Sequence, residues 1–170
     1  MKTIKSGALT LLGSAVLAGA DLEMNIELPR VAVAEYHKPY VAVWLEKEDQ
    51  SFAAHLSVWY DEKKKGREDG TTWLKDLRQW WRKAGRELRV PADGITGATR
   101  PAGVQRLIIP ATHPAIAKLA PGNYHIVVEA AREVGGRELV RMPFTWPMGE
   151  VTLRAKGNSE LGAISMRVRP

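Results

Sequence analysis

The chain of 170 residues contains no cysteine. This absence excludes disulfides, thiol redox chemistry and thiolate metal sites, so a folded domain of this chain must be held together by its core alone. The sequence also lacks long runs of charges of one sign. The longest basic run is Lys63-Lys64-Lys65, and Glu68 and Asp69 follow it closely. A run this short is typical of a solvated loop, and the sequence gives no indication of nucleic-acid binding.

The sequence also lacks the common hydrolase motifs: no Ser-His-Asp order, no paired catalytic carboxylates and no HExxH motif. The histidines are scattered and never lie four residues apart on a helix. Imidazole suits copper and zinc, so a metal site remains an alternative, although scattered histidines more often lie on the surface or are satisfied by hydrogen bonds. These four residues are His37, His55, His113 and His125.

The amino terminus has the three-part layout of a secretory signal peptide. Lys2 and Lys5 give a positive start, a small or apolar run covers residues 7–17, and Ala18-Gly19-Ala20 is a cleavage site. The apolar run is shorter than the ~20 residues of a spanning helix, which disfavours the alternative of an uncleaved anchor. We therefore expect cleavage after Ala20 and a periplasmic location.

The remaining residues, 21–170, have a length typical of a single domain. Removing Lys2 and Lys5 from the 25 basic residues leaves 23 against 19 acidic ones, a mildly basic balance of +4. No second long hydrophobic run occurs, so we expect no membrane-spanning segment after cleavage.

Alternating hydrophobicity is the main structural signal. In residues 21–28 every second residue is apolar, which predicts a half-buried strand. Similar segments and turn signals predict an immunoglobulin-like or fibronectin-type β-sandwich of seven to eight strands, with hairpins at Val134-Gly135-Gly136 and Gly157-Asn158. In residues 54–60 we expect Leu56, Val58 and Tyr60 to share one face. The other predicted strands are 40–47, 104–109, 124–131, 138–146, 151–155 and 163–168.

One segment changes to helical periodicity, with apolar residues at spacings of three and four between Trp73 and Ala84. This predicts one inserted amphipathic helix of three to four turns, with Thr71 or Thr72 as N-cap and Gly85 at a left-handed C-terminal position. We expect most of its aromatic residues, Trp73 above all, to pack into the core.

A local motif supports the sandwich. Tyr124 follows Pro121-Gly122-Asn123, as in the tyrosine corner of such folds, where the hydroxyl bonds back to the nearby backbone. The alternative is an ordinary type II turn before a strand.

The long connection at residues 90–103 contains the segment that suggests chemistry. Gly97 and Ala98 leave the hydroxyl of Thr99 sterically open to a bulky partner. Threonine is a poor nucleophile unless its proton is removed, and no histidine lies within this connection. We therefore expect a separate enzyme to act on it.

This segment resembles the flavinylation motif of extracytosolic flavoproteins, Asp-x-x-Thr/Ser-Gly-Ala-Thr/Ser, found in subunits of sodium-pumping NADH:quinone reductases and their Rnf relatives. The resemblance implies that a Mg-dependent FMN transferase links FMN to Thr99 as a phosphoester. Pro101 departs from the motif, since the family usually has Thr or Ser there. The matching residues are Asp93, Thr96, Gly97, Ala98 and Thr99.

Residues 35–146 are also similar to a periplasmic family, domain of unknown function 2271. The resemblance rests on residues 40–44, on Trp73-Leu74 with 80–82, on the motif, and on 121–124 leading into 128–133. Such proteins tend to be encoded beside PepSY-type membrane proteins and FMN transferases, which implies a periplasmic redox setting.

Two functions follow as hypotheses. The first is an electron-transfer protein carrying FMN on Thr99, with Arg100 and Trp81 near the flavin and a PepSY-type membrane protein as partner. The second is a non-redox periplasmic binding or adaptor module linked to metal or heme transport. In that case Gly94, Gly97 and Pro101 only shape a turn.

Overall fold

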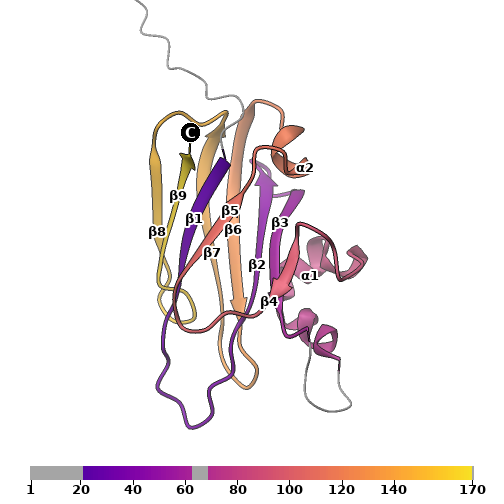
Figure 1. Ribbon diagram of the computed structural model, residues 1–170, viewed down its shortest axis with the longest axis vertical. Coiled ribbons are helices and arrows are strands. Elements are labelled where there is room, and N and C mark those ends of the chain that lie inside the picture. Colours follow the sequence, from indigo (N-terminus) through magenta and orange to yellow (C-terminus); the bar gives the residue numbers. More distant parts are fainter. Residues whose placement is uncertain (1–20, 63–68, 170) are drawn as a thin grey trace, which may run out of the picture.

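A computed structural model describes residues 21–62 and 69–169. The proposed signal peptide and the Lys63-Lys64-Lys65 run lie outside the described residues. The chain forms an all-β sandwich, as predicted, in which two sheets pack face to face and the short helices lie beside the second sheet (Figure 1).

The first sheet has four antiparallel strands in the order β5-β1-β9-β8. The alternation predicted for the first strand is confirmed, because Leu22, Met24 and Ile26 are fully buried against the second sheet. This sheet positions no candidate site residue, but its inward-facing side chains form one side of the core between the sheets. Its strands are β1 (Asp21–Leu28), β5 (Gly103–Ile109), β8 (Thr152–Lys156) and β9 (Ala163–Arg169).

The second sheet has five strands in the order β4-β3-β2-β6-β7. Its edge strand β4 runs parallel to β3 and lies inside the connection at residues 90–103, which was expected to be a loop. The described residues thus form nine strands, one more than the upper prediction, because a three-residue strand has no readable periodicity. The strands are β2 (Tyr40–Lys47), β3 (Phe52–Tyr60), β4 (Thr96–Ala98), β6 (Gly122–Ala131) and β7 (Arg137–Trp146).

In β3 the side chain of Leu56 lies on a different face of the sheet from the one predicted. The β2–β3 register shifts between Val43 and Trp44, where a β-bulge interrupts the pairing. Beyond this bulge Leu56 packs into the core between the sheets, whereas Val58 and Tyr60 pack on the opposite face. The expectation that these three residues share a face is therefore wrong, because an extra residue in one strand breaks the two-residue period.

The predicted single amphipathic helix is broken into three short pieces. A 3₁₀ helix, η1 (Gly70–Asp76), ends before α1 (Arg78–Lys83), and a second 3₁₀ turn, η2, covers Gly85–Glu87. Leu77 between the first two pieces has the non-helical dihedrals φ −74° and ψ 68°. The prediction of one continuous helix is wrong at this residue.

The predicted helix ends also differ. Asp69, not Thr71 or Thr72, is the N-cap of η1, and its carboxylate accepts a hydrogen bond of 3.0 Å from the Thr71 amide. Gly85 does not adopt a positive φ. A β-carbon there would lie 2.5 Å from the Trp80 ring, so glycine allows the indole to approach the backbone.

A buried carboxylate of β6 explains the break. Glu129 is fully buried and accepts hydrogen bonds from the backbone amides of Gln79 (3.1 Å) and Trp80 (2.8 Å), and from Arg137 (2.9 Å). A carboxylate on two free amides caps the start of a new helix. Glu129 therefore sets where α1 begins and holds it against the sheet.

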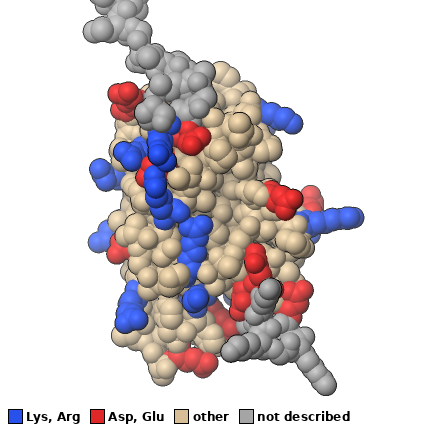
Figure 2. All heavy atoms as spheres, in the orientation of Figure 1, with Lys and Arg blue, Asp and Glu red and all other residues tan. Residues whose placement is uncertain are grey.

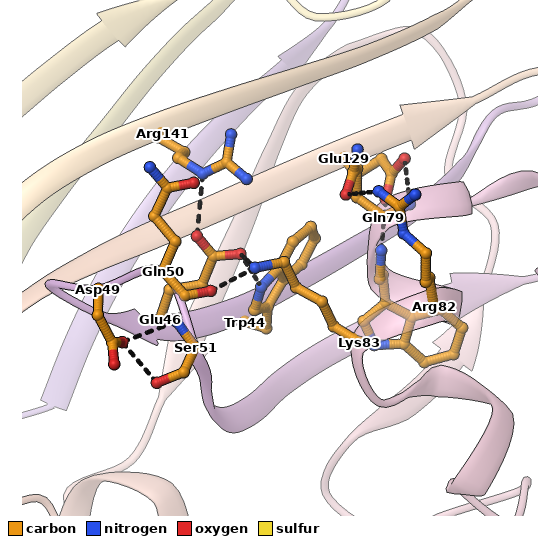
Figure 3. A network of polar contacts seen from close by, with 11 residues as sticks. Trp44, Glu46, Asp49, Gln50, Ser51, Gln79, Arg82, Lys83, Glu129 and Arg141 are labelled. Atoms are coloured by element: carbon orange, nitrogen blue, oxygen red, sulfur yellow. Dashed lines mark hydrogen bonds and ion pairs between the residues drawn. The ribbon is translucent and has the colours of Figure 1, made fainter.

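A second buried carboxylate, Glu46, holds the other end of α1 (Figure 3). It accepts hydrogen bonds from Trp44 (3.0 Å) and Arg141 (2.9 Å) and pairs with Lys83 (2.9 Å). Burial raises the pKa of the Glu46 carboxyl, but its bonds to Arg141, Lys83 and Trp44 outweigh burial and hold that pKa below its ordinary value.

The tyrosine corner is confirmed. The Tyr124 hydroxyl donates a hydrogen bond of 2.9 Å to the Ala120 carbonyl, and its ring lies 5.9 Å from that of Phe144. The two predicted hairpins are also confirmed by the antiparallel pairs β6–β7 and β8–β9. A four-residue helix, α2 (Pro114–Ala117), was not predicted, and His113 caps it.

Charge is unevenly distributed over the view in Figure 2. Lys and Arg side chains run in a column over the four-stranded sheet, and acidic side chains gather towards the helical segment. Two arginines of this sheet are paired with an acidic residue, because Glu23 accepts hydrogen bonds from both Arg106 and Arg167. The helical side, where the candidate site lies, has the more acidic surface in this view.

Candidate functional site

Thr99 lies directly after the edge strand β4. The Thr99 amide donates a hydrogen bond of 3.0 Å to the Tyr60 carbonyl, and the Val58 amide donates one of 2.8 Å to Ile95. These bonds fix the backbone on both sides of β4. The Thr99 hydroxyl makes no hydrogen bond with any residue that the structure describes, so it is available to react.

The other hydroxyl of the motif is already engaged. The Thr96 hydroxyl accepts a hydrogen bond from the Ala92 amide (2.8 Å) and donates one to the Ala92 carbonyl (3.1 Å). Between them Gly94 adopts a φ of +73°, which favours glycine. Thr96 and Gly94 therefore shape the turn that leads into β4.

Gly97 lies in the middle of β4 on the edge of the sheet. A β-carbon built on Gly97 would meet no atom within 4 Å, and Ala98 beside it is exposed. The space next to Gly97 is therefore open among the described residues.

Thr99 forms part of the wall of a cavity of about 270 Å³, which we call the Thr99 cavity. The wall combines the connection before β2, the ends of β3 and β6, and η1. Three aromatic side chains contribute to it: Tyr36, Tyr40 and Trp73. Aromatic faces of this kind stack on flat conjugated rings.

Tyr40 is the most firmly held of these aromatic residues. Its hydroxyl donates a hydrogen bond of 2.9 Å to the Gly70 carbonyl, and its ring meets Tyr60 edge-on at 6.4 Å. Burial raises the pKa of Tyr40 to about 12, so the phenol stays protonated at any physiological pH. Tyr40 therefore offers the cavity a neutral, rigid wall.

The charged groups of the cavity are mainly acidic. Asp61, Asp76 and Glu133 contribute to the wall, against Lys38 and the imidazole of His37. The His37 ring lies between two carboxylates, with Nδ1 3.5 Å from Glu133 and Nε2 3.2 Å from Glu35. Among the residues that the structure describes, the wall has no cluster of cations that would attract a free phosphate.

Asp93 lines a different hollow, which has a volume of about 380 Å³. His55 and His113 also line this second hollow, together with apolar residues. The two ends of the flavinylation-like motif, Asp93 and Thr99, therefore face separate cavities.

Two residues expected near a flavin lie away from the Thr99 cavity. The Arg100 guanidinium lies 3.9 Å from the centre of the Trp59 ring and donates a hydrogen bond of 2.8 Å to the Arg106 carbonyl. Burial lowers the pKa of Arg100. Trp81 packs beside Trp80, with ring centres 6.2 Å apart. Of the helical aromatic residues, Trp73 lines the cavity instead.

Among residues 21–62 and 69–169, no three His, Asp or Glu side chains are grouped so that they could hold a metal ion. His55 accepts a hydrogen bond of 3.1 Å from the Trp80 indole, and burial lowers the pKa of His55 to about 4. It is therefore neutral and structural in the folded protein.

Sequence reasoning missed the residues that surround Thr99. Tyr36, His37 and Lys38 lie in an irregular connection. Trp73 was expected in the core, and it does pack, half-buried, against the second core cluster, but it also lines the cavity. One signal was available: two aromatic residues and a histidine occur between residues 36 and 40, just before a strand. Nothing in the sequence joins that segment to Thr99, about sixty residues later.

Together these features define a β-sandwich with an aromatic cavity at the end of one sheet. The sequence pattern of a family of predicted periplasmic proteins, DUF2271, matches residues 21–163, and the chain belongs to this family. The periplasmic location expected from the leader is thereby confirmed. No curated protein and no solved structure matches the chain. Within the described residues no helix is long and apolar enough to cross a membrane.

Proposed function

We propose that the protein is a periplasmic electron carrier whose FMN is joined to the Thr99 hydroxyl through a phosphoester. The observation that supports this most is the position of Thr99. The residue that the motif designates as acceptor has a free hydroxyl on the wall of an aromatic cavity. The cofactor, when bound, supplies the electron-accepting ring.

The cavity suits the ring of a flavin better than its phosphate. Its volume, about 270 Å³, is slightly below the roughly 300–1,000 Å³ typical of ligand pockets, so it suits part of a nucleotide. Tyr36, Tyr40 and Trp73 offer aromatic surface, whereas the acidic wall does not favour a free phosphate. A covalent bond at Thr99 would hold the phosphate without attraction by charge. We therefore expect free FMN to bind weakly.

The attachment requires an activated donor. In the proposed transfer, Thr99 Oγ1 bonds to the phosphorus of the FMN half of FAD while the pyrophosphate bond breaks. AMP leaves with the bonding electrons, and the hydroxyl proton passes to a base. An FMN transferase would hold the donor, and a PepSY-type membrane protein would exchange electrons with the finished carrier.

The test is co-expression of the full chain with a periplasmic FMN transferase, followed by intact mass and in-gel flavin fluorescence. We expect one FMN to be added with loss of one water. Thr99→Ala should abolish the addition and Thr99→Ser should retain it, while Thr152→Ala, an exposed threonine on β8, is the matched control. An unmodified wild type, under conditions that modify a known acceptor, contradicts the proposal.

The motif offers two finer variants. Gly97→Ala has room for the added methyl group, so it should fold normally but slow the modification by narrowing access to Thr99. Pro101→Thr restores the hydroxyl that the motif family usually has there, and it should speed the modification. Thermal unfolding of each variant checks that the fold is unchanged.

A second function, a non-redox binding module, is favoured by the hollow beside Asp93. This hollow of about 380 Å³ has mainly apolar walls and two histidines, which suits a small apolar ligand better than a metal. Metal analysis of the purified protein tests the metal version. A stoichiometric metal that is lost in His55→Ala or His113→Ala would favour this function over the carrier.

A further inference from the structure

The fold places a histidine on the same cavity wall as Thr99, although none lies near it in the sequence. We infer that His37, oriented by Glu133, accepts the proton of the Thr99 hydroxyl when that hydroxyl is modified, an inference that rests on the proposed function. The acceptor protein would then supply the general base for its own flavinylation, and the transferase would mainly deliver the flavin.

The contacts of His37 suit this role. Its Nδ1 lies 3.5 Å from a carboxylate oxygen of Glu133, and both side chains are 29% exposed. Its Nε2 lies 3.2 Å from Glu35, which is 81% exposed. Exposed ion pairs contribute little free energy, so the contact with Glu35 is easily given up. Nε2 can then turn towards the cavity while Glu133 holds Nδ1.

This arrangement has the logic of a nucleophile, a base and an orienting carboxylate. Such groups are often loosely arranged in free proteins and tighten only when the reacting group is bound. Here Thr99 and His37 line one small cavity but share no hydrogen bond. The incoming flavin phosphate would complete the site by placing its phosphorus beside Thr99.

The step balances without an oxidant or reductant. The bond from Thr99 Oγ1 to phosphorus forms, and the pyrophosphate bond of FAD breaks to release AMP. The hydroxyl proton moves to Nε2 of His37, and the Glu133 carboxylate stabilises the resulting imidazolium. The proton then leaves to solvent, which resets the base.

The other groups of the cavity explain why pH is an informative probe. Lys38, Asp61 and Asp76 face the cavity with His37, as does Tyr40, whose raised pKa of about 12 keeps it neutral. Among the described residues of this wall, His37 is the one with an imidazole side chain. Imidazole is the side chain that ordinarily changes charge between pH 5 and 8.

The experiment measures the initial rate of FMN addition to purified full-length protein. Purified transferase, FAD and Mg²⁺ are supplied, and the rate is followed by flavin fluorescence from pH 5.5 to 8.5. We expect the wild-type rate to rise with pH, and His37→Gln to be about 100-fold slower at pH 7.5, with a flatter profile. Glu133→Gln should show a smaller loss. His125→Gln, a histidine on β6 outside this cavity, is the matched control and should keep the wild-type rate and profile.

The outcomes separate the inference from the function on which it rests. If His37→Gln is modified at the wild-type rate with the wild-type pH profile, the transferase supplies the base and the inference is wrong, while the carrier function stands. If the wild type is not modified at all while a known acceptor is, both are wrong. Thermal unfolding of His37→Gln and His37→Asn excludes misfolding, because a change of rate at unchanged Tm reflects the base.

Discussion

In strand β6 the neighbouring residues Val128 and Glu129 point to opposite faces of the same sheet and meet different surroundings. Val128 is buried in the apolar core between the sheets. Glu129 is equally buried, but its carboxylate binds the start of α1 and Arg137. The face towards the first sheet, the dry face, is closed by the main apolar core, whereas the opposite, polar face combines a second apolar cluster with this polar network.

The difference explains how the candidate site is built. Apolar packing is non-directional, so it fixes the sandwich without specifying the position of any loop. Buried carboxylates bind in defined directions, and here Glu129 and Glu46 fix both ends of α1 against the sheet. Only Leu77 separates η1 from α1, so fixing α1 against the sheet also limits where η1, with Trp73 at the Thr99 cavity, can lie.

Replacing Glu129 gives the largest expected effect and tests the comparison directly. Glu129→Ala leaves one buried amide, one partly buried amide and Arg137 without their acceptor, and should lower the free energy of unfolding by about 3–5 kcal/mol. Val128→Ala, its neighbour on the dry face, should cost roughly 2 kcal/mol. Urea denaturation of both variants measures the two values. A smaller loss for Glu129→Ala than for Val128→Ala would mean that the network does not stabilise this face.

Acid should weaken the interactions of His55 and Glu46 on the polar face before it affects the apolar packing on the dry face. His55 has its pKa lowered to about 4 when folded, against an ordinary value of 6.5, so it stabilises the fold fully above pH 6.5. That contribution is lost as pH falls towards 4. Glu46, whose folded pKa is also lowered, adds a further loss below its ordinary pKa of 4.5. Urea denaturation between pH 7 and 4 should show the decline. His55→Gln, which can still accept the Trp80 hydrogen bond, should flatten it above pH 4.5.

A smaller effect is expected at the one hydrogen bond that closes the tyrosine corner. Tyr124→Phe keeps the ring against Phe144 but removes the bond to Ala120, and should cost about 1 kcal/mol. Tyr36→Phe removes a hydroxyl from an exposed ring and serves as control. Equal Tm values for the two variants would show that the corner contributes nothing.

The smallest predicted effect has the opposite sign. Val134 at the tip of the β6–β7 hairpin is 92% exposed and has a φ of 51°, a left-handed conformation that β-branched residues disfavour. Val134→Asn should stabilise the protein by about 0.5 kcal/mol, because asparagine tolerates this conformation and no packing is lost. A lower Tm in this variant would contradict the assigned strain.

Local features of the sequence predicted most of the sandwich. The alternation of residues 21–28 predicted β1, and the Pro121-Gly122-Asn123 turn before Tyr124 predicted the corner. The leader and the motif around Thr99 are equally local, and the periplasmic location followed from the first of them. Each of these signals depends only on residues that are close together in the chain.

Tertiary structure decided what surrounds Thr99. The helix breaks at Leu77 because Glu129, some fifty residues later in the chain, offers its carboxylate to the amides beyond the break. Three residues of the presumed loop become β4 because β3 has a free edge beside them. β2 and β3 lie between His37 and Thr99 in the chain. Because these strands pair within one sheet, they bring both residues to the wall of the Thr99 cavity. Partners this distant leave no period in the sequence, since their effect exists only once the sheets have paired.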